Sequence, residues 1–172
     1  MLSIQTVNSD SLELLKAISA QPEMRDLRLV GGTALALQYG HRQSVDLDFF
    51  GPLPAEKDAL IDVARRVGSV MVLNQSKIIL QKDIAAMKVN AIIGRGTRKD
   101  FIDLYVLLLH YSLAEILGFY EQKYPEFSEY RALMSMTYFD DAELQDMPLM
   151  FIDTPWDEMK KAIIQAVNAY QQ

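Results

Sequence analysis

Two acidic side chains separated by one residue are the strongest chemical feature of this sequence. Asp46 and Asp48 lie in a run with apolar neighbours, Val45-Asp46-Leu47-Asp48-Phe49-Phe50, which is typical of a β-strand. Alternate residues of a strand face the same side, so we expect both carboxylates to point toward one place. Neighbouring carboxylates repel each other unless a cation lies between them, and Mg²⁺ (or Mn²⁺) prefers such oxygen ligands. The spacing therefore predicts a metal site at Asp46 and Asp48.

A glycine pair precedes these acids. Gly31 and Gly32 end a predicted strand at residues 27–30 and lead directly into a predicted helix at residues 33–39. The free N–H groups at the start of such a helix can bind phosphate oxygens. The alternative is that the glycines only form a turn, that Thr33 caps its own helix and that the acids line a solvated edge. We favour a site for phosphoryl or nucleotidyl transfer, because the glycine turn and the paired acids occur together in this sequence.

Lys88 is unusual because it lies on the apolar stripe of a predicted helix at residues 83–93. An unpaired ammonium group would cost several kcal/mol there, so Lys88 needs a negative partner. Asp46, Asp48 and Asp100 are the candidates, and a nucleotide phosphate is an equal alternative. Asp100 also has a structural explanation, since it is the third helical position of a capping box that begins at Thr97.

Cationic residues gather in two places near the predicted site. The first is His41-Arg42, just before the acidic strand, and the second is the loop at residues 94–99. Arg42 is our preferred contact to a phosphate, although an ordinary solvated loop explains both patches equally well. Asp103 lies four residues after Lys99, and we expect the two to pair on the surface of a helix.

Hydrophobic spacing places these residues in a small sheet that is followed by helices. We expect helices at residues 9–20, 33–39 and 54–67, and strands at residues 27–30, 45–50, 69–73 and 77–80. Beyond Asp83 we expect only helices: one at residues 83–93, two that begin with capping boxes at Thr97 and Ser112, and a last one with Pro155 at its first position. The pattern predicts an α/β (α+β) fold, with residues 1–82 as the sheet region and residues 83–172 as a helical region packed on it in one compact unit.

Composition excludes several classes of protein. The 172 residues include 23 acidic and 17 basic side chains, a formal net charge of −6, and no cysteine. An acidic chain does not bind nucleic acid indiscriminately, and without cysteine it has no disulfide and no thiolate site. There is no signal-like start and no apolar run of about 20 residues. We therefore expect a cytoplasmic protein without membrane contact.

Longer stretches resemble the AbiEii/AbiGii-type nucleotidyltransferase toxin family. The likeness is carried by Leu29-Val30-Gly31-Gly32-Thr33-Ala34-Leu35-Ala36-Leu37, by His41-Arg42-Gln43-Ser44-Val45-Asp46-Leu47-Asp48-Phe49-Phe50, and by residues 83–88 and 94–105. It covers roughly residues 10 to 110 and implies that the small mixed sheet has a polymerase-β-like nucleotidyltransferase topology.

The resemblance also implies roles for single residues. Metal would bind at Asp46 and Asp48, which together with Lys88 and Asp100 would form the catalytic set. The nucleotide would be held by Gly31, Gly32, Thr33, Arg42 and Ser44. The substrates would be an NTP and an acceptor such as RNA, and an antitoxin protein would be a partner.

One departure from the resemblance concerns a third carboxylate. Enzymes of this fold add an acid from a neighbouring strand, which we expect between the strand at residues 77–80 and the helix from Asp83. Only two residues separate those elements, so the strand and its acid are expected to be missing, either because the protein lost them or because this sequence lacks a segment. Asp83 is better explained as a helix cap than as a replacement. Three functions stay open: a nucleotidyltransferase, a nucleotide-binding pseudoenzyme, and a helical module for protein interaction without catalysis.

Overall fold

The structure is a computed structural model of the 172-residue chain, and it describes residues 2–51, 81–126 and 128–172. The expected helix at residues 54–67 and the expected strands at residues 69–73 and 77–80 lie outside these ranges. The side chain of Asp83 lies outside the description as well.

Short elements make up the N-terminal part of the chain. In order they are η1 (Ile4–Thr6), α1 (Ser9–Ser19), η2 (Pro22–Met24), β1 (Arg28–Val30), α2 (Gly31–Tyr39) and β2 (Asp48–Phe50). Asn8 caps α1, because its side chain accepts a hydrogen bond of 2.7 Å from the Ser11 N–H. The helix α2 ends at Gly40, whose φ of 66° lies in the left-handed region that favours glycine at a helix end.

The strands β1 and β2 form an antiparallel pair. Val30 pairs with Asp48, and Leu29 pairs with Phe49. The ladder stops at Val30 because the chain turns into α2 at the next residue. The strand expected at residues 45–50 is therefore wrong in its first half, since Asp46 lies in the connection that precedes β2. The backbone carbonyl of Asp46 accepts a hydrogen bond from the Thr33 hydroxyl instead of joining the ladder.

Helices make up the part of the chain after residue 80, as expected. They are α4 (Gln81–Gly94), α5 (Arg98–Leu108), α6 (Leu113–Lys123), α7 (Glu129–Met136), α8 (Asp140–Glu143) and α9 (Trp156–Tyr170). Both capping boxes are confirmed: the Asp100 carboxylate accepts from Thr97, and the Glu115 carboxylate accepts from Ser112. Pro155 precedes α9 instead of occupying its first position.

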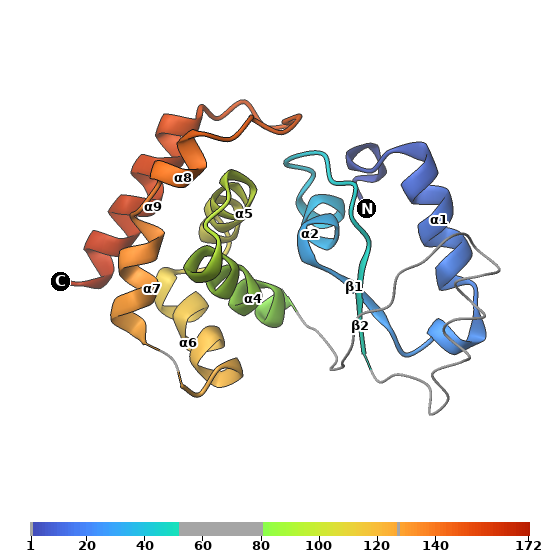
Figure 1. Cartoon of the computed structure of the whole chain (residues 1–172), viewed down its shortest axis with the longest axis horizontal. Helices are drawn as coiled ribbons and strands as arrows, with labels where there is room; N and C mark the ends of the chain where they lie inside the picture. Colours follow the sequence, from blue (N-terminus) through green and yellow to red (C-terminus); the bar gives the residue numbers. More distant parts are fainter. Residues whose placement is uncertain (1, 52–80, 127) are drawn as a thin grey trace.

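The buried core extends over both parts of the chain. Figure 1 shows α4 and α5 between α2 on one side and α6, α7 and α9 on the other. Leu35 of α2 is 1% exposed and belongs to the same apolar cluster as Val89 of α4 and Phe101 of α5. The described residues form helices and a strand pair, which confirms the mixed α/β fold class. The domain boundary expected at residue 82 stays a prediction.

The connection between α8 and α9 returns to the segment that precedes β2 (Figure 1). The Gln43 N–H donates to the Leu149 carbonyl at 2.8 Å, and the Phe151 N–H donates to the His41 carbonyl at 2.9 Å. These bonds pair the connection between α8 and α9 with residues 41–43, which include His41 and Arg42.

Within the described part of the chain, no single helix is both long and apolar enough to cross a bilayer. The pair α5 and α6 meets the length and composition only together, and a bend of 117° separates the two helices. The shorter apolar stretch Ile84–Gly94 lies in α4, whose Ala85, Ala86 and Val89 are fully buried in the core.

Candidate active site

Asp48 lies beside the glycine turn. Because it pairs with Val30, the last residue of β1, its side chain reaches the start of α2. A Cβ atom added to Gly31 would lie only 2.4 Å from Asp48 Oδ2, so the carboxylate packs directly on the backbone of this glycine. Gly31 also has a φ of 69°, a backbone conformation that residues with a side chain rarely adopt. Glycine is needed here both for the backbone conformation and for the room that the acid occupies.

Several charges surround the Asp48 carboxyl group. Burial against the turn and the negative charge of Asp46 raise its pKa, while the positive charges of Lys88 and Arg95 lower it in part. Asp46 and Asp48 both keep exposed surface. Asp46 lies in the connection before β2, so the strand alternation that predicted a common face for the two carboxylates does not apply to it. The predicted site at Asp46, Asp48 and Lys88 stays a prediction.

Asp103 is the centre of a buried ion cluster. Its carboxylate lies 2.7 Å from His41 Nε2, 2.8 Å from Arg42 Nε and 2.7 Å from Lys88 Nζ, and Arg42 Nη2 donates a further bond of 2.8 Å. Burial would raise the pKa of Asp103, but the charge of Lys88 and the hydrogen bonds from His41 and Arg42 hold it well below its usual range. Asp103 is 0% exposed, so the expected surface pair with Lys99 is wrong.

Asp100 receives a second group of donors. Lys88 Nζ lies 3.1 Å from its Oδ1, and Arg95 binds both oxygens, with Nε at 2.9 Å and Nη2 at 3.0 Å. The Thr97 N–H and hydroxyl donate to Oδ2. Although burial acts in the opposite direction, these donors lower the pKa of Asp100 to about 2. Lys88 therefore has two carboxylate partners, of which Asp100 was among the expected ones and Asp103 was not.

The remaining predicted nucleotide-binding residues surround the glycine turn. The Thr33 hydroxyl bonds the Ser44 hydroxyl at 2.8 Å, and both residues are buried. A Cβ atom at Gly32 would lie 2.5 Å from Arg42 Nη2, which places the guanidinium group against the second glycine. Arg42 is 3% exposed, and its third donor, Nη1, binds the Gln43 carbonyl at 3.0 Å. Its contact to a phosphate stays a prediction.

Sequence reasoning missed Asp103 and gave Arg95 no individual role. A signal for Asp103 was present. Asp100 and Asp103 are three residues apart, so they lie on the same face of a helix. Lys88, with an ammonium group on an apolar helix, required strong compensation, and two acids on a facing helix supply it. For Arg95 the sequence showed only a basic loop, and its bidentate geometry depends on the turn between α4 and α5.

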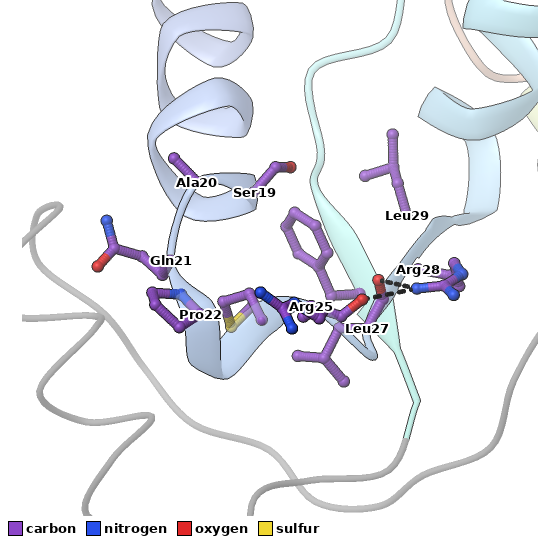
Figure 2. A pocket seen from close by; sticks show the side chains of 10 residues that line it. Ser19, Ala20, Gln21, Pro22, Arg25, Leu27, Arg28 and Leu29 are labelled. Carbon is purple, nitrogen blue, oxygen red and sulfur yellow. Dashed lines mark hydrogen bonds between the residues drawn. The ribbon is translucent and has the colours of Figure 1, made fainter.

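A cavity of about 410 Å³ lies between the end of α1, η2 and the strand pair (Figure 2). It is lined by residues at the end of α1, in η2 and in β1, together with Phe49. Phe49 follows Asp48 in β2, so the two side chains point to opposite faces of the strand. Arg28 at its wall donates to the carbonyls of Arg25 and Leu27, at 2.9 and 3.1 Å. This cavity is separate from the cluster of charges described above.

The paired acids and the glycine turn lie inside a region that is similar to a known family. Residues 13–83 match the family described as "Nucleotidyl transferase AbiEii toxin, Type IV TA system". The AbiEii match ends before Lys88, Asp100 and Asp103. In the fold, Lys88 and Asp103 are connected through Arg42 to Gly32, which lies within the match. No solved structure matches the chain.

The chain is also similar to an uncharacterized protein of Aquifex aeolicus (strain VF5). The two are 27% identical over 206 aligned positions, which cover 97% of this chain and 98% of the relative. Since the alignment is longer than the 172 residues of this chain, it contains at least 34 internal positions at which this chain has no residue. The alignment covers both proteins almost from end to end, so the relative has residues at internal positions where this chain has none.

The acids fit a metal ion in one particular way. Among the described residues, no group of three or more His, Cys, Asp or Glu side chains could hold a metal ion. Asp46 and Asp48 nevertheless suit Mg²⁺, which proteins commonly bind through one or two carboxylates while substrate phosphates and water complete the octahedron. Binding of a metal ion by Asp46 and Asp48 stays a prediction.

Proposed function

We propose that this chain is a nucleotidyltransferase that transfers a nucleotide from an NTP to an acceptor such as RNA, with Mg²⁺ or Mn²⁺ held by Asp46 and Asp48. The observation that carries the proposal is the contact of the Asp48 carboxylate with Gly31, at a place where the charges of Asp46, Lys88 and Arg95 act on the same group. The AbiEii match over residues 13–83 supports the reaction class and the role of a toxin with an antitoxin partner.

The reaction has a simple balance. An acceptor oxygen forms a bond to the α-phosphorus, the bond to the bridging oxygen breaks, and pyrophosphate and a proton leave. A bound metal ion would neutralise phosphate charge and orient the reacting groups. The protein's own contribution is position and charge: Gly31 and Gly32 present backbone at the start of α2, and Lys88 is fixed between Asp100 and Asp103.

Fixation of Lys88 matters for such a reaction. A lysine side chain loses considerable rotational freedom when it binds a ligand. Here the ammonium group is already held by two carboxylates, at 3.1 and 2.7 Å, and its side chain is 8% exposed. The conformational entropy of the Lys88 side chain is already lost when the protein folds. Its charge therefore acts on Asp48 and on any phosphate beside it without further rearrangement.

The test is incubation of the full chain with labelled NTPs and bulk RNA in Mg²⁺ or Mn²⁺. We expect labelled product from the native protein and none from Asp48→Ala. Lack of transfer with every NTP and both metals would refute the proposal.

A second candidate is a nucleotide-binding pseudoenzyme. One observation favours it: the alignment with the Aquifex relative contains positions at which this chain has no residue. In that case an NTP raises the melting temperature of the native protein, but not of Asp48→Ala, and no transfer occurs. The two measurements together separate the candidates.

A further inference from the structure

Asp100 carries two cations that differ strongly in accessibility. Its Oδ1 atom is shared by Lys88 Nζ at 3.1 Å and Arg95 Nη2 at 3.0 Å, so the two positive groups are neighbours. The side chain of Lys88 is 8% exposed, whereas that of Arg95 is 64% exposed. Lys88 is therefore the inner and Arg95 the outer cation of the same carboxylate.

Asp100 holds Arg95 in place through only two of the three guanidinium nitrogens. Its Nε and Nη2 atoms bind the two oxygens of Asp100 in the bidentate geometry that fixes a guanidinium plane. Burial of Asp100, at 0% exposure, keeps this anchor rigid. Nη1 does not take part in the pair and has no acceptor among the described residues, so within this part of the chain it retains two N–H donors for another acceptor.

Arg42 is different, although the sequence favoured it. Its Nε and Nη2 atoms bind Asp103, Nη1 binds a backbone carbonyl, and the residue is 3% exposed. A phosphate would have to displace a buried carboxylate to reach it, which is costly. Among the described arginines and lysines that bind the two buried carboxylates, Arg95 is the one that an incoming anion meets first.

Arg95 is linked to the glycine turn through the buried ion cluster. Arg95 shares Asp100 with Lys88, and Lys88 shares Asp103 with Arg42. The guanidinium group of Arg42 lies against Gly32, next to the glycine that Asp48 contacts, so a chain of contacts connects Arg95 to the glycine turn. We infer that Arg95, through Nη1 and with Asp100 as its anchor, binds the triphosphate of the NTP. This inference rests on the proposed function and names the residue that recognises the polyphosphate part of the substrate.

Binding titrations with the full chain test the inference. The probes are Mg²⁺ complexes of ATP, GTP, CTP and UTP, inorganic tripolyphosphate, and the four free nucleosides. We expect Arg95→Ala to weaken binding of NTP and tripolyphosphate about 10- to 100-fold, the usual effect of losing a hydrogen bond to a charged group, and to leave nucleoside binding unchanged. Arg95→Lys keeps the charge and should recover part of the loss.

The matched control is Arg131→Ala, which removes an exposed arginine from α7 and should change affinity less than about 2-fold. If Arg95→Ala also lowers the melting temperature, Arg95→Lys decides between the two roles. A purely structural role predicts that Arg95→Lys changes the affinity for NTP and the affinity for nucleoside by the same factor. Native affinity in Arg95→Ala, or an equal loss for nucleosides and NTP, overturns the inference alone. Failure of the native protein to bind any NTP or tripolyphosphate overturns the proposed function with it.

Discussion

Asp48 carries a negative charge that the folded protein disfavours. Burial and the neighbouring Asp46 raise its pKa, so folding costs more with the ionised group than without it. We predict that Asp48→Asn loses transfer activity and yet melts at the same or a higher temperature than the native protein. Calorimetry and the RNA-labelling assay, run on one preparation, give both numbers.

This combination is characteristic of a group retained for function. A lower melting temperature for Asp48→Asn would show that the carboxylate stabilises the fold, and that the paired acids have a structural explanation.

Asp103 presents the opposite case. Its carboxylate is fully buried and compensates Lys88 and Arg42, so removal of its charge leaves two buried cations without their main partner. We predict that Asp103→Asn lowers the free energy of unfolding by about 3–5 kcal/mol. Urea denaturation of both proteins measures the difference.

The control for that prediction is Asp157→Asn. Asp157 pairs with Lys160 at 2.9 Å on an exposed turn of α9, where screening by solvent leaves an ion pair little net effect. Equal changes in Asp103→Asn and Asp157→Asn would show that the buried cluster is not a source of stability.

At the scale of elements, the turn from β1 into α2 decides whether Asp48 reaches its place. We predict that Gly31→Ala abolishes transfer, because its Cβ atom would lie 2.4 Å from Asp48 Oδ2 and its φ of 69° is strained for alanine. Activity assays and thermal melts of the variant are the measurement.

Gly40→Ala is a close match for Gly31→Ala. It has nearly the same φ, 66°, but its Cβ atom would meet the flexible Ser3 hydroxyl at 2.7 Å instead of an acid. Both variants should lose about 1 kcal/mol through backbone strain, and only Gly31→Ala should lose activity. Equal activities would contradict the positioning role of the turn.

Local signals predicted many of these elements correctly. The capping boxes at Thr97 and Ser112 act through side chains and backbone within a few residues, and both have the structural effect that the sequence predicts. The predicted strand begins earlier than β2 does, because the first residue of β2 is determined by pairing with β1. The strand begins where β1 ends, at Val30, and no pattern within residues 45–50 contains that information.

The candidate site was predictable to a similar degree. The paired acids, the glycine turn and the need of Lys88 for an acid follow from residue type and spacing. Asp103 required knowledge of which helix faces α4, since its neighbourhood of His41, Arg42 and Lys88 is assembled from three separate segments. Pairing across distant segments is a tertiary property, and a helical repeat alone does not reveal it.

For the whole molecule, the buried cluster is a link between its parts. Asp103 and Asp100 on α5 bind Lys88 on α4, and Asp103 binds His41 and Arg42 on the segment that pairs with Leu149 and Phe151. Charges that hold distant segments together make the stability of the fold depend on pH.

The sign of that dependence follows from the two lowered pKa values. A carboxyl group with a pKa of about 2 in the folded state and about 4 in the unfolded chain stabilises the fold fully above the higher value, and this contribution is lost as the pH falls toward the lower one. Asp103, with its pKa well below the usual range, acts in the same direction. Asp48 acts in the opposite direction, because its pKa is raised and its protonation in acid relieves repulsion.

We therefore predict that the free energy of unfolding falls steeply between about pH 5 and pH 2. The slope should be smaller in Asp100→Asn, which lacks one stabilising carboxylate, and larger in Asp48→Asn, which lacks the opposing one. Urea denaturation at half-unit steps of pH gives the three curves. Parallel curves for the three proteins would mean that other acidic groups control the acid response, whereas a divergence in the two opposite senses ties the stability of the whole chain to the carboxylates of the candidate site.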